Sequence, residues 1–141
     1  MKKYIKCEFN SSLDNVIISR GIISSFFIDE NININVINEV KTIVSEAVTN
    51  AIVHGYKDKE GAVSLNMEYE NNILQLEIVD KGIGIKNIEE AKTPLFSTSK
   101  DTERAGLGFT IMEIFSDNLE IISNENEGTT IKITKSIKWY E

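Results

Sequence analysis

Four short stretches of the 141-residue sequence place polar or flexible residues where a ligand would need them. The first is SEAVTNAIVHGY, residues 45–56, in which Glu46 and Asn50 stand four positions apart. In an amphipathic helix this spacing puts a carboxylate and an amide on one face, beside the apolar stripe. Taken alone, the pair is more simply interpreted as a solvated polar edge of the helix.

The second stretch is DKGIGI, residues 80–85, where a strand ends on Asp80 and continues into Gly82 and Gly84. The carboxylate of Asp80 can accept a hydrogen bond from an exocyclic amine. The two glycines let the backbone turn sharply and approach a ligand closely. An ordinary turn after a strand has the same pattern. The stretch is not the dinucleotide-binding fingerprint, because it lacks the third glycine and the strand-helix-strand unit.

The third and fourth stretches carry further glycines at the ends of predicted elements. In ERAGLGFT, residues 103–110, Gly106 and Gly108 precede a helix, and the free N–H groups at a helix start form an anion site. EGTT, residues 127–130, turns into the last strand and ends on Thr130. A flexible helix entry and a plain hairpin are the simpler interpretations of these two stretches when each is taken singly.

The elements that would position these residues follow from hydrophobic periodicity. Alternation predicts strands over 4–9, 63–69, 73–79, 119–122 and 129–133, and helical spacing predicts helices over 13–27, 36–54 and 107–116. In the first helix, Arg20 interrupts an apolar stripe made of Leu13, Val16, Ile17, Ile23 and Phe27. The second helix is predicted to end near His54 and Gly55, where glycine supplies a left-handed stop.

Hairpins group the predicted strands, and Asn71–Asn72 is a plausible two-residue turn between two of them. This grouping favours an α+β pair of layers over a parallel sheet. Residues 81–106 lack a long periodic pattern, and a loop of that length in a compact domain is typically a lid or binding loop. We therefore expect one domain over 1–141 with a lid at about 85–106.

The bulk composition excludes several classes of protein. A net charge of −7 and a pI near 4.8 disfavour direct binding to nucleic acid and are compatible with a basic protein partner. Cys7 is the one cysteine, so no internal disulfide is possible. No secretory signal or transmembrane run is present, which predicts a cytoplasmic protein without membrane contact.

In this order, the four stretches resemble the GHKL ATPase superfamily. The resemblance implies a two-layer α/β sandwich, with a mixed sheet covered by helices on one face and ATP held between helices and lid. It implies that Glu46 is the general base and that Asn50 is a ligand of Mg²⁺ at the phosphates. It further implies that Asp80 accepts from the adenine amine. The residues implied to lie close to the nucleotide are Gly82, Gly84, Gly106, Gly108 and Thr130.

The sequence is more closely similar to one branch, the family of anti-sigma-F factors, which are sporulation serine kinases. VSEAVTNAIVHGY, PLFSTSK, ERAGLGFTIMEIFSD and GTT carry that similarity. It implies a homodimer that binds sigma F, blocks its use by RNA polymerase, and phosphorylates an anti-anti-sigma protein on serine. It also implies that the helix bearing Arg20 contacts both partners. Ala105 and Lys81 depart from the family pattern, at positions where serine and an acidic or amide residue are more usual.

Several related functions remain open from the sequence. A general-stress anti-sigma kinase would share every motif. An ATP-dependent binding module would keep Asn50 and Asp80 while its carboxylate was idle. A histidine kinase domain would need a phospho-accepting histidine on a separate dimerisation helix, whereas His54, the one histidine, lies on the second predicted helix itself. A machine like gyrase or MutL would need further domains to couple hydrolysis to motion.

Overall fold

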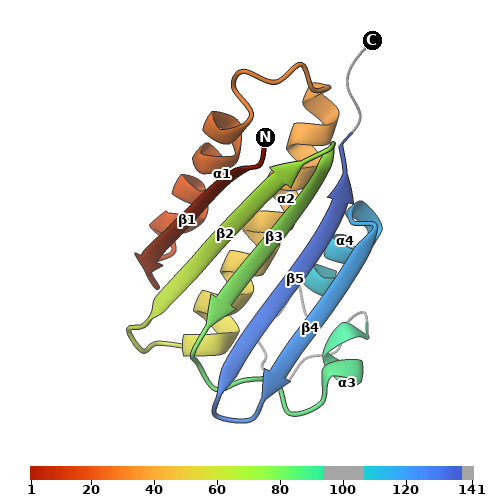
Figure 1. The fold of residues 1–141 in the computed structure, drawn as a ribbon. Helices are drawn as coiled ribbons and strands as arrows, with labels where there is room; N and C mark the ends of the chain where they lie inside the picture. Colours follow the sequence, from red (N-terminus) through yellow and green to blue (C-terminus); the bar gives the residue numbers. More distant parts are fainter. Residues whose placement is uncertain (94–106, 138–141) are drawn as a thin grey trace.

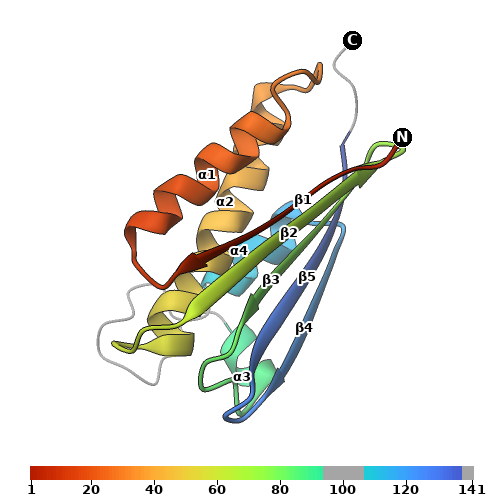
Figure 2. The same ribbon diagram turned by 60° about the vertical axis from the view of Figure 1, so that its left-hand side comes forward.

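The computed structural model of the chain describes residues 1–93 and 107–137. These residues form two layers, an antiparallel sheet with helices packed against one of its faces (Figures 1 and 2). In chain order the elements are β1 (Lys3–Asn10), α1 (Asp14–Phe26), α2 (Ile34–Asn50), the π-helical segment η1 (Ala51–Tyr56), β2 (Ala62–Glu70), β3 (Ile73–Asp80), α3 (Ile88–Lys92), α4 (Leu107–Phe115), β4 (Asn118–Asn124) and β5 (Gly128–Ser136).

The strand order in the sheet is β1-β2-β3-β5-β4, and every neighbouring pair is antiparallel. The α+β two-layer class is confirmed, whereas the expectation of a mixed sheet is corrected by this pairing. The connections explain the difference. Because α1 and α2 run in opposite directions, they return the chain to the end of the sheet where β1 stops, so β2 enters antiparallel to it (Figure 1).

The hairpin between β2 and β3 forms at the predicted turn. Asn71 and Asn72 have φ of 53° and 64°, so both central residues are left-handed. This is the conformation of a two-residue type I′ turn, which asparagine tolerates well and which matches the twist of the flanking strands. The turn fixes the register of β2 against β3, in which Val63 lies opposite Asp80.

The core lies between the sheet and α2, which runs between α1 and α4 behind the strands (Figure 1). Alternate residues of the central strands point inward, and one face of α2 covers them. The fully buried residues on these elements include Val40, Ile43, Val44, Ala47, Val48, Val63, Leu65, Met67, Leu74, Leu76, Ile78 and Ile133. Burial of each Val, Leu, Ile or Met side chain among them stabilises the fold by about 1.5–3 kcal/mol.

The inward face of α1 differs from the predicted apolar stripe. Its buried residues are Asn15, Ser19, Ile23 and Phe26, while Ile17 is 74% exposed. The side chain of Asn15 is held by the backbone carbonyl of Asn10, which turns this polar residue inward at the end of β1. The helix is therefore rotated relative to the prediction, and part of its apolar surface faces outward.

The end of the second helix also differs from the prediction. After Asn50 the helix continues as η1, and the residue with positive φ that follows it is Lys57, with φ of 56°, rather than Gly55. Gly55 is buried inside η1. Its lack of a side chain serves a close contact instead of a helix stop, as described below. Within residues 1–93 and 107–137, no helix has the length and apolar character to cross a membrane.

Candidate functional site

Asp80 is the buried centre of the candidate site, at the end of β3. Only 6% of its surface is exposed. Its Oδ1 accepts a hydrogen bond of 2.9 Å from the backbone N–H of Gly82. Burial raises the pKa of the Asp80 carboxyl above its ordinary value, and the backbone N–H groups of Gly82 and Thr129 oppose that rise. A buried carboxylate whose position is set by backbone donors is suited to read a hydrogen-bond donor on a ligand.

The backbone of η1 lies directly against this carboxylate. A Cβ added to Gly55 would lie 2.8 Å from Oδ1 of Asp80, and one added to Gly82 would lie 2.1 Å from the carbonyl oxygen of Gly55. The N–H of Ile83 donates to the same carbonyl over 2.9 Å. Glycine at positions 55 and 82 therefore lets η1 and the loop after β3 approach one another, with Asp80 between them.

Gly84 lies farther along the same loop and contacts the β4–β5 hairpin. Its φ is +72°, and an added Cβ would lie 2.0 Å from the carbonyl oxygen of Asn124. The N–H of Asn126 donates to the carbonyl of Ile83 over 2.5 Å. The loop that carries Gly82 and Gly84 is thus tied on both sides, to η1 and to the hairpin.

Thr129, which the sequence interpretation missed, shares the face of Asp80. The two residues are register partners on β5 and β3, and Thr129 is 6% exposed. Thr130, the residue that was predicted, pairs with Val79 and is half-buried on the opposite face of the sheet. The sequence could have indicated this, because alternate residues of a strand lie on the same face. Residue 129 therefore shares the inward face of the apolar Ile131.

Glu46 lies near the start of α4. It is 6% exposed, so it is not the solvated helix edge that the simpler interpretation suggested. A Cβ added to Gly108 would lie 3.1 Å from its Oε2. The structure thus brings together two of the predicted site residues, one from α2 and one from α4.

Asn50 ends α2 and is half-buried, one helical turn beyond Glu46. The segment η1 begins at the next residue and leads to Gly55, which touches Asp80. Single π-helical turns are frequent at functional sites. Here the turn follows α2 at its C-terminal end and carries Gly55 against Asp80.

Part of the predicted lid falls on described residues. Asn87 caps α3 by accepting from the N–H of Glu90 over 3.1 Å, and Lys92 pairs with Glu113 of α4 at 2.9 Å. This short helix was not predicted, because five residues are too few to show a period. Gly106, Pro94 and Ala105 lie outside the described residues.

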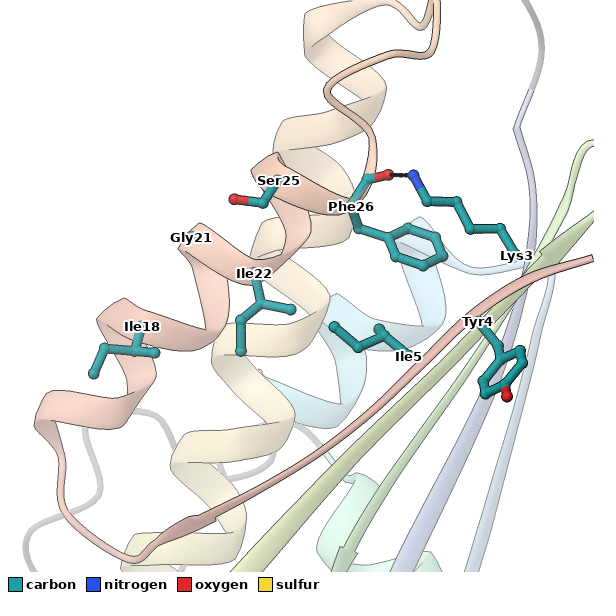
Figure 3. Close-up of a pocket in the computed structure, with 8 residues that line it drawn as sticks. All are labelled: Lys3, Tyr4, Ile5, Ile18, Gly21, Ile22, Ser25 and Phe26. Atoms are coloured by element: carbon teal, nitrogen blue, oxygen red, sulfur yellow. Dashed lines mark hydrogen bonds between the residues drawn. The ribbon is translucent and has the colours of Figure 1, made fainter.

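Arg20 lies on α1. Its Nη1 donates to Oγ of Ser45 over 2.8 Å, which links α1 to the α2 residue next to Glu46. Nearby, a hollow of about 630 Å³ lies between α1 and β1. In Figure 3, Ile5, Ile22 and Phe26 lie around it and Lys3 reaches the backbone carbonyl of Phe26. This side of the molecule is open and apolar.

The fold agrees with comparisons to known proteins. Residues 9–135 match the family model described as a histidine kinase-like ATPase domain. The chain is 44% identical over 136 residues to the anti-sigma F factors of Bacillus thuringiensis and Bacillus mycoides, covering 96% of this chain and 93% of each relative. The chain therefore belongs to the histidine kinase-like ATPase family and, within it, to the group of anti-sigma F factors.

Solved structures share the fold at low sequence identity. The RsbU and RsbW domains of a Mycobacterium tuberculosis protein match with a TM-score of 0.70 and 14% identity, over 99% of this chain and 35% of that one. The catalytic domain of histidine kinase ThkA matches with a TM-score of 0.57 and 18% identity, over 94% of this chain and 95% of that one. The chain thus shares its fold with these two solved structures.

Proposed function

We propose that this chain is an anti-sigma factor that also acts as an ATP-dependent serine kinase. It binds a sporulation sigma factor of the sigma F type, which keeps that factor from RNA polymerase. It phosphorylates an anti-anti-sigma protein on serine and so inactivates its own antagonist. The proposal combines the family of the chain with the observation that carries it, the buried carboxylate of Asp80 between η1 and the loop after β3.

In this proposal Asp80 accepts from the exocyclic amine of adenine. Its burial supports the role, because a hydrogen bond to a charged acceptor is stronger when water is excluded. Gly82 and Gly84 pass close to the nucleotide, and Gly106 and Gly108 present N–H groups to the phosphates. Thr129 rather than Thr130 accompanies Asp80 at the base, since it is the threonine on the same face.

The residues at the phosphate end fit Mg²⁺. Asn50 offers an amide oxygen, and Mg²⁺ prefers oxygen ligands from one or two side chains together with substrate phosphates. The described part of the chain contains no group of three or more His, Cys, Asp or Glu residues that could hold a metal by themselves. Asn50 would therefore hold a metal ion that arrives with the nucleotide, and the metal would neutralise phosphate charge.

Glu46 would act as the general base for the incoming serine. Asn50 is one turn away on the same helix, roughly 5–6 Å along the surface. That spacing leaves the phosphates on the Asn50 side and the serine hydroxyl on the Glu46 side. A helix holds the two groups more rigidly than a loop would. The base takes the proton of the serine hydroxyl as the serine oxygen attacks the γ-phosphorus of ATP, and the bond from that phosphorus to the bridging β-phosphate oxygen breaks to release ADP.

The open side of the molecule would receive protein partners. Ile17 and Ile18 are 74% and 55% exposed on α1, and Ile18 lines the hollow of Figure 3, beside the edge strand β1. An unpaired strand edge next to apolar surface is a typical place for association between chains. This supports a homodimer formed through α1 and β1, with Arg20 placed to contact the sigma factor and the anti-anti-sigma protein.

Replacing Glu46 with Gln tests the kinase mechanism. The shape is kept and the base is removed, so phosphoryl transfer to the anti-anti-sigma protein should fall by ~10²–10⁴-fold in a single-turnover assay. Binding of ATP and of the sigma factor should remain near that of the wild type. Glu39→Gln is the matched control, because Glu39 lies on the same helix and pairs with Lys135 at 3.5 Å. Wild-type transfer rates in Glu46→Gln would remove Glu46 from the mechanism.

A second experiment distinguishes a sporulation anti-sigma kinase from a general-stress anti-sigma kinase and from a binding module without kinase activity. Pull-down with purified sporulation and general-stress sigma factors, with and without ATP, should recover the sporulation factor in an ATP-dependent manner. Arg20→Glu should weaken that complex or the complex with the anti-anti-sigma protein. Recovery of the general-stress factor alone would identify the chain as a stress anti-sigma kinase. Sigma binding with no phosphoryl transfer to any anti-anti-sigma protein would identify a binding module.

A further inference from the structure

Tyr56 joins three elements of the structure through one hydroxyl. It is the last residue of η1 and is buried, with 9% of its surface exposed. Its Oη donates to the carbonyl of Ala62 over 2.5 Å and accepts from the N–H of Lys81 over 2.7 Å. Ala62 begins β2, and Lys81 directly follows Asp80. The phenol therefore bridges the end of η1, the start of β2 and the end of β3.

The position of the ring is set by its surroundings. A Cβ added to Gly61 would lie 2.2 Å from Cε1 of Tyr56, so the loop before β2 passes flat against the ring. The N–H of Gly61 donates to Oγ of Ser11 over 3.0 Å, which anchors the same loop to the end of β1. The N–H of Lys59 donates to the carbonyl of Tyr56 over 2.9 Å and closes the turn after η1.

The hydrogen bonds of Tyr56 and Gly55 hold the backbone that follows Asp80. The residue after Asp80 is bound by the Tyr56 hydroxyl, and the N–H of Ile83 is bound by the carbonyl of Gly55. Two neighbouring residues of η1 thus hold the chain on both sides of Gly82, whose N–H donates to the Asp80 carboxylate. Loss of the Tyr56 hydroxyl would free the Lys81 end of this segment and leave a partly buried N–H without its acceptor.

We propose that Tyr56 is a positioning residue for base recognition, whose hydroxyl fixes the Asp80 carboxylate where it selects a purine with an exocyclic amine. The proposal rests on the proposed function, in which Asp80 reads adenine. It assigns to Tyr56 a part in nucleotide specificity beyond its contribution to stability. A residue that acted on stability alone would affect all nucleotides equally.

The test compares binding of ATP with binding of ITP, which carries a 6-oxo group in place of the amine. Dissociation constants are measured by calorimetry with Mg²⁺ for the wild type, Tyr56→Phe, Asp80→Asn and Tyr69→Phe. Tyr69→Phe is the matched control, because Tyr69 is a buried phenol that bonds Asn72 over 3.3 Å at the other end of β2. The wild type should prefer ATP, and Tyr69→Phe should keep that preference.

Tyr56→Phe should lower the preference for ATP roughly tenfold, about 1.4 kcal/mol, with ITP binding nearly unchanged. Equal weakening of both nucleotides, or an unchanged preference, would overturn the proposal. Asp80→Asn should lose or reverse the preference, because an amide can donate to a 6-oxo group. If Asp80→Asn keeps the wild-type preference for ATP over ITP, the proposed recognition of adenine by Asp80 is overturned instead. Failure of the Tyr56 proposal can therefore be distinguished from failure of the proposed function.

A second measurement covers the case in which Tyr56→Phe does not fold. Hydrogen exchange of the Lys81 amide in the wild-type protein reports directly on the bond to Tyr56. Protection close to the limit of global unfolding, in the absence of nucleotide, supports the positioning role. Exchange as fast as that of an unprotected amide overturns it.

Discussion

The Asp80 end of the sheet and the outward face of α1 are built in opposite ways, and two glycines show the contrast. A Cβ on Gly82 would lie 2.1 Å from a backbone oxygen, whereas a Cβ on Gly21 of α1 would meet nothing within 4 Å. Around Asp80, backbone segments contact one another directly. On α1, Ile17 and Ile18 face outward and Gly21 lines an open hollow.

The difference indicates which surfaces are complete within one chain. The end of the sheet is held by internal hydrogen bonds, so its shape does not depend on a partner. Such preorganisation raises affinity, because less ordering is required when the ligand binds. The face of α1 keeps apolar surface in contact with water, which is typical of a surface that another protein covers.

The largest expected effect comes from filling the crowded glycine. Gly82→Ala forces the loop away from Gly55 and breaks the close packing around Asp80. We expect a loss of about 3 kcal/mol in the free energy of unfolding, at the upper end for overpacked sites. Phosphoryl transfer should fall on the order of 100-fold in the molecules that remain folded, since a shift of about 1 Å disrupts an aligned site. Denaturant unfolding and single-turnover kinetics measure the two effects.

An effect of intermediate size is expected for Asp80→Asn, which should change ATP affinity and stability in opposite directions. Asp80→Asn should weaken ATP binding roughly 10- to 100-fold by removing a charged hydrogen-bond acceptor. The apoprotein should become more stable at neutral pH, because the variant no longer buries a charge. Titration calorimetry and thermal unfolding of the same samples measure these opposite changes. A variant that loses both affinity and stability would show that the charge of Asp80 supports the fold.

The pH dependence of stability in the wild type and in Asp80→Asn tests whether the buried charge of Asp80 is the cause. Burial raises the pKa of the Asp80 carboxyl in the folded state above its ordinary value of 3.8. The folded state therefore binds more protons than the unfolded state between those two pKa values, and stability from this group falls as pH rises through that window. The stability advantage of Asp80→Asn should thus shrink as pH falls below the raised pKa. A constant difference from pH 7 to pH 4 would contradict it.

The smallest effect comes from filling the open glycine. Gly21→Ala replaces glycine inside a helix where space is available, so we expect a gain of about 0.5–1 kcal/mol in the free energy of unfolding. ATP binding should not change. Thermal unfolding across a range of protein concentrations makes the measurement. Destabilisation that grows with concentration would show that a second copy packs against Gly21.

Local signals in the sequence were enough for much of the fold. Within the part of the chain that the structure describes, alternation and helical spacing located all five strands and the three longer helices, and Asn71–Asn72 gave the hairpin turn. The face of α1 was misjudged, since apolar spacing alone favoured Ile17, which is exposed. The inward turn of Asn15 depends on a bond to Asn10 at the end of β1, and periodicity does not encode such a contact.

The candidate site shows the same division between local and long-range information. Asp80 and Gly82 were found because they are neighbours in sequence, and the roles given to them remain proposals. Tyr56 was missed because its two partners are backbone atoms of Ala62 and Lys81, which the fold brings to it. Gly55 was interpreted as a helix stop, although its contact with Asp80 is a sufficient reason for its small size.

The pairing of β1 with β2 has a consequence for the order of folding. The hairpin of β2 and β3 closes through the short turn Asn71–Asn72. The pairing of Asn10 with Ala62, in contrast, closes a long connection that contains both α1 and α2. Closing that long connection costs chain entropy before its contacts form, so such pairings tend to form late. We expect β1 to join the sheet after the rate-limiting step. Substitutions in its inward residues should then speed unfolding while leaving the folding rate nearly unchanged.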